Sequence, residues 1–233
     1  MKKINFLILV ITIFLPIKSF ALIEVDITRG NLNPLPIAVS SLSSNEQTRS
    51  DLKKELKIED VGLEISKVIE NNFRQSGLFN PLSKDAFLQK ADIAHLKPRF
   101  EDWALIKAQA LVTGKVTFKD DKLRVEFRLW DILAAKEMLA LAFTTVPNNW
   151  RRVGHIISDK VFERLTGEKG YFDTRIIYVS EKGLKTQRIK KLAIMDQDGF
   201  NTKYLTLGNE LVLTPRFNPT NQMVTYLSYF KNL

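Results

Sequence analysis

His155 and Asp159 are a pair of residues whose types and spacing could support acid–base catalysis. They lie four positions apart in a segment with helical periodicity, which places both side chains on one helix face. Such a pair could act as a general base and its orienting carboxylate, but no nucleophile motif accompanies it, and we favour a structural contact. His95, the other histidine, has no visible partners for a zinc site. We therefore predict no catalytic residue, no metal site and no cofactor.

Two further sequence features limit the chemistry. The motif Asp196-x-Asp198-Gly199 faintly resembles a calcium loop, but the later ligands and the closing Glu are missing, so a turn is the better interpretation. The chain has no cysteine, which excludes disulfides, thiolate metal sites and thiol nucleophiles. One enzymatic alternative is an exported propeller-bearing peptidase whose catalytic domain is missing. That class needs a Gly-x-Ser-x-Gly elbow, which this sequence does not contain.

The net charge of +9 is spread along the chain rather than concentrated. Three lysines fall within residues 1–21, and runs of like charge are short, as in Arg151-Arg152 and Lys190-Lys191. A nucleic-acid-binding protein more often concentrates its charge in a stripe with aromatic residues beside it. We therefore expect a mildly basic solvated surface and no nucleic-acid partner.

The first 21 residues have the parts of a secretory signal. A short positive start precedes the apolar run 4–15, which is too short to span a hydrocarbon core. Ser19 and Ala21 then put small residues at the two positions that a signal peptidase reads. The sequence thus predicts export, with cleavage between Ala21 and Leu22. An uncleaved membrane anchor is the alternative.

Residues 22–170 alternate between helix and strand patterns. Apolar residues recur at helical spacing from Asp60 to Phe73 and again from Trp150 to Leu165. Strands are predicted at 36–39, 111–118, 122–130 and 138–146, and Asp120-Asp121 forms the turn of a hairpin. Residues 40–57 are polar and are interpreted as a mobile connection, and 99–108 as a short helix. The pattern predicts an α+β domain with helices packed on one side of a mixed, mostly antiparallel sheet.

After Gly170 the helical pattern stops. Four short strands are predicted at 174–180, 188–195, 203–206 and 223–228, with turn residues between them. Four short antiparallel strands make one propeller blade, so residues 171–233 are interpreted as the first blade of an incomplete β-propeller. A single blade leaves a face without a neighbour, and we expect the chain to self-associate while residues 22–170 alone stay well behaved.

An ordered set of motifs resembles the TolB family over essentially all of the chain that follows the signal. The motifs share their order and spacing with the domain junction and flanking regions of that family: Ser76-Gly77-Leu78-Phe79, Leu129-Trp130-Asp131, Trp150-Arg151-Arg152, His155, Ser158-Asp159-Lys160, Leu165-Thr166-Gly167, Gly170 to Ile176, Asp196-x-Asp198-Gly199, Leu205-Thr206 and Thr214-Pro215-Arg216-Phe217. The resemblance implies an N-terminal α+β domain followed by a six-bladed propeller. It also implies a non-enzymatic component of the Tol-Pal system in the periplasm.

The resemblance further implies two protein partners and a role in outer-membrane integrity and in cell division. In the family the propeller holds the peptidoglycan-associated lipoprotein Pal, and the N-terminal tail contacts the C-terminal domain of TolA. That tail maps onto Leu22, Ile23, Glu24, Val25, Asp26, Ile27 and Arg29. Alternating apolar and polar residues suit a strand added to the edge of a partner's sheet. An edge strand of its own domain is the alternative for this segment.

Two departures from the family pattern affect these expectations. Where the family favours Ser-Pro-Asp-Gly, this chain has Asn218-Pro219-Thr220-Asn221, in which Asn tolerates the left-handed turn conformation. The sequence also ends five blades short, and the Pal-binding surface belongs mostly to later blades. We therefore expect a fragment or truncated chain, and Pal binding is left open.

Overall fold

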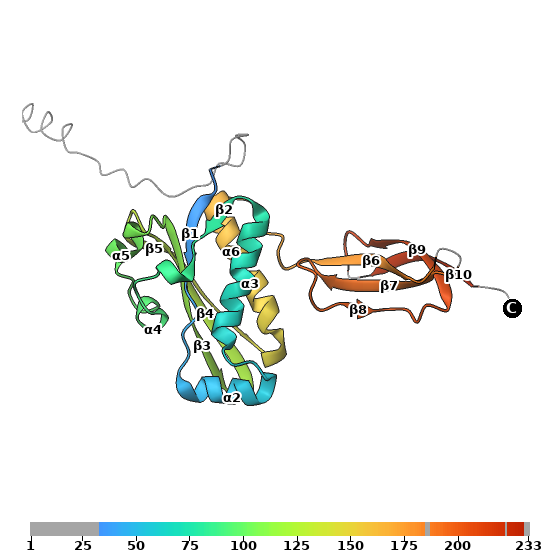
Figure 1. Cartoon of the computed structure of the whole chain (residues 1–233), viewed down its shortest axis with the longest axis horizontal. Helices are drawn as coiled ribbons and strands as arrows, with labels where there is room; N and C mark the ends of the chain where they lie inside the picture. Colours follow the sequence, from blue (N-terminus) through green and yellow to red (C-terminus); the bar gives the residue numbers. More distant parts are fainter. Residues whose placement is uncertain (1–32, 185–186, 222, 231–233) are drawn as a thin grey trace, which may run out of the picture.

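The computed structural model describes residues 33–184, 187–221 and 223–230 (Figure 1). The predicted signal, its cleavage site at Ala21 and Leu22, and the tail at 22–29 lie outside these residues. Within the described ranges, no helix is both long enough and apolar enough to cross a membrane.

The first half of the chain is built around a five-stranded sheet with the strand order β2-β1-β3-β4-β5. Its strands are β1 (Leu35–Val39), β2 (Phe79–Pro81), β3 (Ala110–Lys119), β4 (Lys122–Asp131) and β5 (Lys136–Thr145). Strand β1 runs parallel to both of its neighbours, whereas β3, β4 and β5 form an antiparallel meander. Asp120 and Asp121 both have positive φ, as the tight hairpin turn between β3 and β4 requires. The predicted mixed sheet is confirmed.

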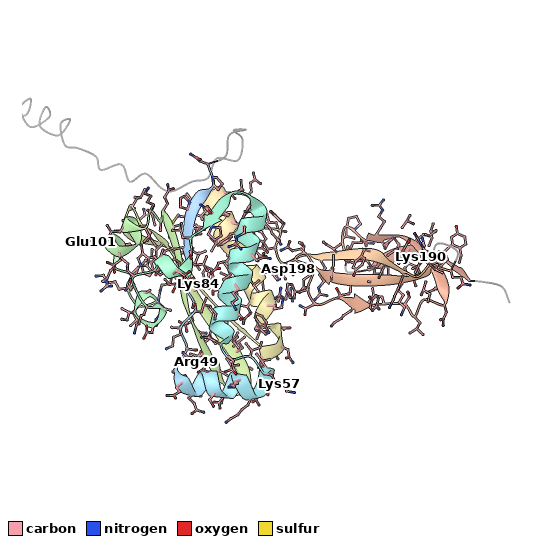
Figure 2. All side chains as sticks on the ribbon, in the orientation of Figure 1. Arg49, Lys57, Lys84, Glu101, Lys190 and Asp198 are labelled. Atoms are coloured by element: carbon pink, nitrogen blue, oxygen red, sulfur yellow. The ribbon has the colours of Figure 1, made fainter. Side chains whose placement is uncertain are left out.

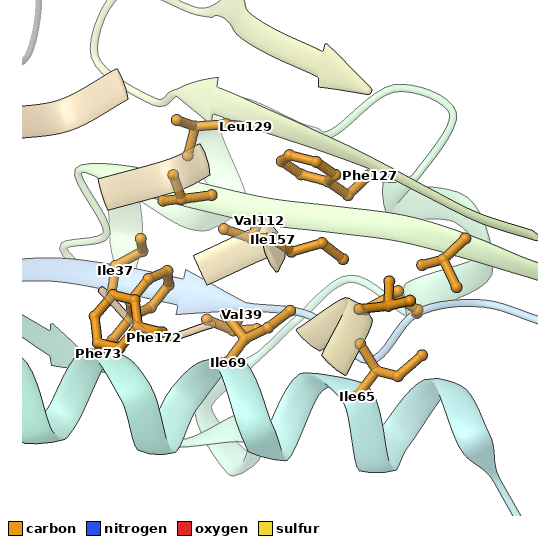
Figure 3. Close-up of a cluster of buried hydrophobic side chains, with 14 of the residues drawn as sticks. Ile37, Val39, Ile65, Ile69, Phe73, Val112, Phe127, Leu129, Ile157 and Phe172 are labelled. Atoms are coloured by element: carbon orange, nitrogen blue, oxygen red, sulfur yellow. The ribbon is translucent and has the colours of Figure 1, made fainter. Parts of the chain in front are cut away.

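Two long helices, α3 (Val61–Ser76) and α6 (Trp150–Thr166), pack together on one face of this sheet (Figure 1). Helix α3 begins where the Asp60 side chain accepts the Leu63 N–H and ends at Gly77 in the left-handed conformation. The helices approach closely at Gly154, where an added Cβ would lie 3.0 Å from the Val68 side chain. Figure 3 shows the apolar core between these helices and the sheet, with Ile65, Ile69, Phe73, Val112 and Ile157 among its side chains.

The opposite face of the sheet is covered in part, which the sequence pattern did not predict. The segment with η1 (Lys84–Ala86), α4 (Ala91–Ala94) and α5 (Phe100–Leu105) builds a second apolar cluster over β1, β3 and β4. Trp103 is buried at its centre, and its Nε1–H donates to Gln89 Oε1 at 3.1 Å. The prediction of helices on one side only is therefore incomplete.

The polar stretch at 40–57 is not a mobile connection, because it contains helix α2 (Glu46–Leu56). Asn45 caps its N-terminus by accepting the Thr48 N–H at 2.8 Å. Thr48 and Leu52 are the buried residues of α2, so the apolar face was too narrow to give a clear helical period. The turn η2 (Pro147–Asn149) then joins β5 to α6.

The second half of the chain forms two separate sheets rather than one blade. Strands β6 (Arg175–Lys182), β7 (Ile189–Asp196) and β8 (Lys203–Tyr204) make a three-stranded antiparallel sheet. Strands β9 (Glu210–Phe217) and β10 (Val224–Phe230) pair with each other instead of with β8. The four strands predicted for this half did not include β9, and they do not form a single four-stranded sheet, because β10 pairs with β9 in a second sheet.

Candidate functional site

A buried polar cluster lies where helices α3 and α6 meet the turn between β7 and β8. We call it the junction cluster and define it by five residues: Asn72, Arg151, His155, Gln197 and Asp198. Three come from the two long helices and two from the turn, so the cluster joins the two halves of the chain. Figure 2 shows Asp198 at the point where they meet.

His155 is at the centre of the junction cluster. Its side chain is 2% exposed, and its Nδ1 atom lies 3.0 Å from the amide nitrogen of Asn72. An amide nitrogen donates, so Nδ1 accepts and the neutral ring carries its proton on Nε2. Nε2 lies 3.6 Å from Asp198 Oδ2. Burial lowers the pKa of His155, the Asp198 carboxylate opposes this shift, and the Arg151 guanidinium adds to it.

Asn72 connects three elements through one side-chain amide. Besides His155, its Nδ2 group donates to Ser158 Oγ at 2.8 Å, which again belongs to α6. Its Oδ1 atom accepts from Gln197 Nε2 at 2.9 Å. Asn72 itself is fully buried, so each of these bonds satisfies a polar atom that water does not reach.

An ion pair between Arg151 and Asp198 completes the cluster. The Asp198 side chain is 1% exposed and that of Arg151 is 14% exposed, and the two are hydrogen-bonded. The Arg151 guanidinium also lies 3.9 Å from the ring centre of Phe200, just after the same turn. Breaking such a buried pair leaves an uncompensated charge, so the geometry fixes the turn against the start of α6.

His155, Asp196 and Asp198 bring ligand-type atoms within 4.8 Å of one another, a spacing compatible with a metal ion. Asp198, however, is already ion-paired with the positively charged guanidinium of Arg151. Asp196 accepts from the Asn201 amide and lies 3.9 Å from Arg175. A cation would compete with these positive groups, so we interpret the three residues as an ion-paired cluster and assign no metal to them.

Asp159 has a different role from the one its spacing to His155 suggested. Its carboxylate accepts the backbone N–H of Phe172 at 2.6 Å and of Asp173 at 3.1 Å. It therefore holds the linker between α6 and β6, while His155 is oriented by Asn72. Burial raises the pKa of Asp159, and the two hydrogen bonds partly offset that shift. Gly170 lies directly against Asp159, where a Cβ would collide with it.

The linker is also anchored by an aromatic side chain. Phe172 is buried in the core between the long helices and the sheet, where its ring centre lies 5.7 Å from that of Phe162 and 6.5 Å from that of Phe73. The linker therefore packs into the α+β core at Phe172 before the chain enters β6.

A cleft of about 250 Å³ opens beside the junction cluster. Its walls combine the start of α6, the linker and the β7–β8 region, and they are lined by Asn148, Asn149, Arg151, Arg152, His155, Asp173, Thr174, Arg175, Ile194, Met195, Asp196, Asn201 and Lys203. Both charge signs are present, and Arg152 is paired with Asp173 at 3.0 Å. The cleft is thus a polar seam between the halves of the chain.

The two halves match two parts of one known family. Residues 23–138 match the TolB amino-terminal domain, and residues 162–232 match the TolB beta propeller domain. The Tol-Pal system protein TolB of Pelagibacter ubique (strain HTCC1062) is 80% identical over 224 residues. This chain belongs to the TolB family. The match covers 96% of this chain and 50% of the Pelagibacter protein, so the chain spans about half the length of that relative.

A solved member of the TolB family has the same fold. The crystal structure of TolB from Acinetobacter baumannii superimposes with a TM-score of 0.69 at 22% identity, covering 88% of this chain and 47% of that one. The fold is an α+β domain followed by the start of a β-propeller, as the sequence predicted.

Of the residues singled out in the sequence, the structure brings His155 and Asp198 together and separates His95 from them. His95 follows α4, and its Nδ1 lies 3.2 Å from Ser43 Oγ. The TolA-type tail predicted for the TolB family (Leu22, Ile23, Glu24, Val25, Asp26, Ile27 and Arg29) lies outside the described residues, so its placement stays a prediction.

Sequence reasoning missed Asn72, Arg151 and Gln197 as parts of this site. Asn72 carried a usable signal, because it is a polar residue on the apolar face of α3, next to Phe73. For Asp198 the sequence pattern predicted only a position in a turn. The turn is confirmed, with Gly199 at positive φ, but a turn motif does not show what its side chains touch.

Proposed function

We propose that this chain is a non-enzymatic, periplasmic protein-binding component of the Tol-Pal system. In this role it links TolA and Pal, maintains the integrity of the outer membrane and supports its invagination during cell division. The observation that carries the proposal is the 80% identity to the Tol-Pal system protein TolB of Pelagibacter ubique. Export rests on the signal pattern of residues 1–21.

The TolA contact is assigned to the tail at residues 22–29. Ile23, Val25 and Ile27 alternate with the charged residues Glu24 and Asp26, which suits a strand that pairs with the edge of a partner's sheet. Main-chain hydrogen bonds would supply the affinity of such a strand, and its alternate apolar side chains would supply the specificity.

Pal binding is assigned to propeller blades, of which the structure describes the strands β6 to β10. Several apolar side chains on these strands and their connections are exposed, including Leu205, Leu207 and Leu227. Such surface is what neighbouring blades would cover. The alternative is therefore a fragment that binds TolA through its tail and lacks Pal binding.

The arrangement of the junction cluster supports a binding protein over a hydrolase. Ser158 is the hydroxyl-bearing residue of α6 that is closest to His155 in the sequence, and it is fully buried. Its Oγ donates to the Gly154 carbonyl at 2.9 Å and accepts from Asn72. A nucleophilic serine needs an exposed hydroxyl bonded to its base, and here both the hydroxyl and the ring are used in structural contacts.

Calorimetric titration of residues 22–233 with the isolated C-terminal domain of TolA tests the proposal. We expect binding, weakened by roughly tenfold or more in Val25→Asp, because a charge replaces an apolar side chain of the added strand. Val146→Asp is the matched control, since Val146 is exposed and lies after β5. A folded protein that does not bind TolA would contradict the proposal.

The same protein titrated with Pal separates the two versions of the function. Binding to both partners supports the linking role. Binding to TolA without binding to Pal selects the fragment alternative, and Pal binding that is lost in Val25→Asp would contradict the assignment of the two contacts to different regions.

A further inference from the structure

We propose that His155 is a pH-sensitive latch: protonation of its ring releases the β7–β8 turn from helix α3. The proposal goes beyond partner binding, since it concerns how the two halves of the chain are held together. It rests on the hydrogen-bond directions within the junction cluster and on the burial of its members.

The directions of these hydrogen bonds follow from Asn72. Its Nδ2 group has two hydrogens, which go to His155 Nδ1 and to Ser158 Oγ, and Ser158 in turn donates to the Gly154 carbonyl. The remaining atom, Oδ1, accepts from Gln197. The bond between Asn72 and Gln197 is thus formed when the His155 ring is neutral and its Nδ1 accepts.

A second proton on His155 would enter at Nδ1, where the Asn72 amide already points a hydrogen. The clash is relieved when Asn72 turns its amide over and presents Oδ1 to the ring. The Asn72 Nδ2 group then faces Gln197 Nε2, and two donors oppose each other. Gln197 has to turn or withdraw as well. Protonation is therefore incompatible with the present hydrogen bond between Asn72 of α3 and Gln197 of the turn.

Charged groups from α6, the linker and the β7–β8 region influence the protonation of the ring. Asp198 and Asp196 face it from the β7–β8 region and Asp173 from the linker, and all three favour the charged ring. Arg151, on α6 itself, disfavours it, and Asp159 interacts with it from the next turn of α6. Burial is the largest influence, and the resulting pKa of His155 lies below its usual value.

Because the pKa of His155 is lowered in the docked state, docking of the turn should weaken at low pH. With the turn released, water reaches the ring, and the pKa of His155 returns toward the usual value of ~6.5. The docked state therefore binds fewer protons than the released state. The docking free energy is fully present above about pH 6.5 and is lost as the pH falls from there toward the lowered pKa of the docked ring.

Hydrogen exchange of the mature chain, residues 22–233, measured on either side of ~pH 6.5, tests the latch. After correction for the intrinsic exchange rate, we expect protection of the amides at 196–201 to fall by roughly tenfold per pH unit below that point. His155→Gln should leave this protection independent of pH to within about twofold, while His95→Gln should behave as the unaltered chain does. Equal protection at both pH values in the unaltered chain would overturn the proposal.

A second measurement keeps the proposal falsifiable if His155→Gln does not fold. The chain has only two histidines, so NMR titration of their ring Cε1–H signals follows His155 directly, with His95→Gln for assignment. In Gln197→Ala the docking contact is gone, and the His155 midpoint should rise toward ~6.5. An unchanged midpoint in Gln197→Ala contradicts the coupling between the ring and the turn.

Discussion

Asn72 of α3 and Gln197 of the β7–β8 turn are 125 positions apart in the sequence, and a 2.9 Å hydrogen bond joins their side chains. The Arg151–Asp198 ion pair attaches the same turn to α6. The linker is a further attachment between the α+β core and the first sheet, where Asp159 holds the backbone and Phe172 fills the core. The hydrogen bonds of the linker do not involve the His155 ring, so loss of the Asn72–Gln197 bond would leave the two halves attached through the linker and through Arg151 and Asp198.

Phe172→Ala should destabilise the α+β core by about 3–5 kcal/mol, as expected when a fully buried aromatic side chain is removed. The measurement is urea unfolding followed by tryptophan fluorescence, since Trp103 and Trp130 are buried in the second apolar cluster, on the opposite face of the same sheet. Tyr171→Ala is the control, because Tyr171 is 47% exposed and should cost much less. Similar losses for the two variants would show that Phe172 does not anchor the linker.

Asp159→Ala should lower the free energy of unfolding by roughly 2–3 kcal/mol, because two backbone N–H groups of the linker lose a charged acceptor. Thermal unfolding at neutral pH checks this value. Lys160→Ala is the adjacent control, since Lys160 is paired with Glu163 at an exposed site and should change stability little. If the two variants are equally stable, the carboxylate does not fix the linker.

The α+β layer was predictable because its periodicities are strong. Helix α3 and the hairpin of β3 and β4 were both recognised, since their apolar residues recur at clear helical or alternating spacing. Helix α2 was missed because burial of two residues gives no such period, although Asn45 before it is a typical cap.

The junction cluster could be predicted only in part, for a physical reason. His155 and Asp198 were both singled out, but a hydrogen bond across 125 positions depends on tertiary packing, and no local pattern reports it. Strand β9 was not among the predicted strands, so its pairing with β10 could not be predicted either; strand signals also do not show which sheet a strand joins.

Arg151→Met should raise the pKa of His155, because the positive guanidinium that lowers it is removed while Asp198, which raises it, stays. The docked and released values of this pKa then lie closer together, so the docking free energy lost below about pH 6.5 should be smaller. NMR titration of the His155 ring measures the shift. Arg152→Met is the matched control, since Arg152 pairs with Asp173 at a more exposed site, and it should leave the midpoint nearly unchanged. A lower midpoint in Arg151→Met would contradict the charge balance given for the ring.

The exposed apolar side chains of the second half should make the chain self-associate. Leu207 is 82% exposed, and Leu205, Leu227 and Tyr229 are at least half exposed on strands or connections of two narrow sheets. Apolar patches beside open strand edges favour association, whereas both faces of the five-stranded sheet are covered at least in part. Light scattering after size exclusion should show residues 22–233 associating in a concentration-dependent way and residues 22–174 staying monomeric. Two monomeric species of equal heat stability would mean that these sheets cover their own apolar surface in solution.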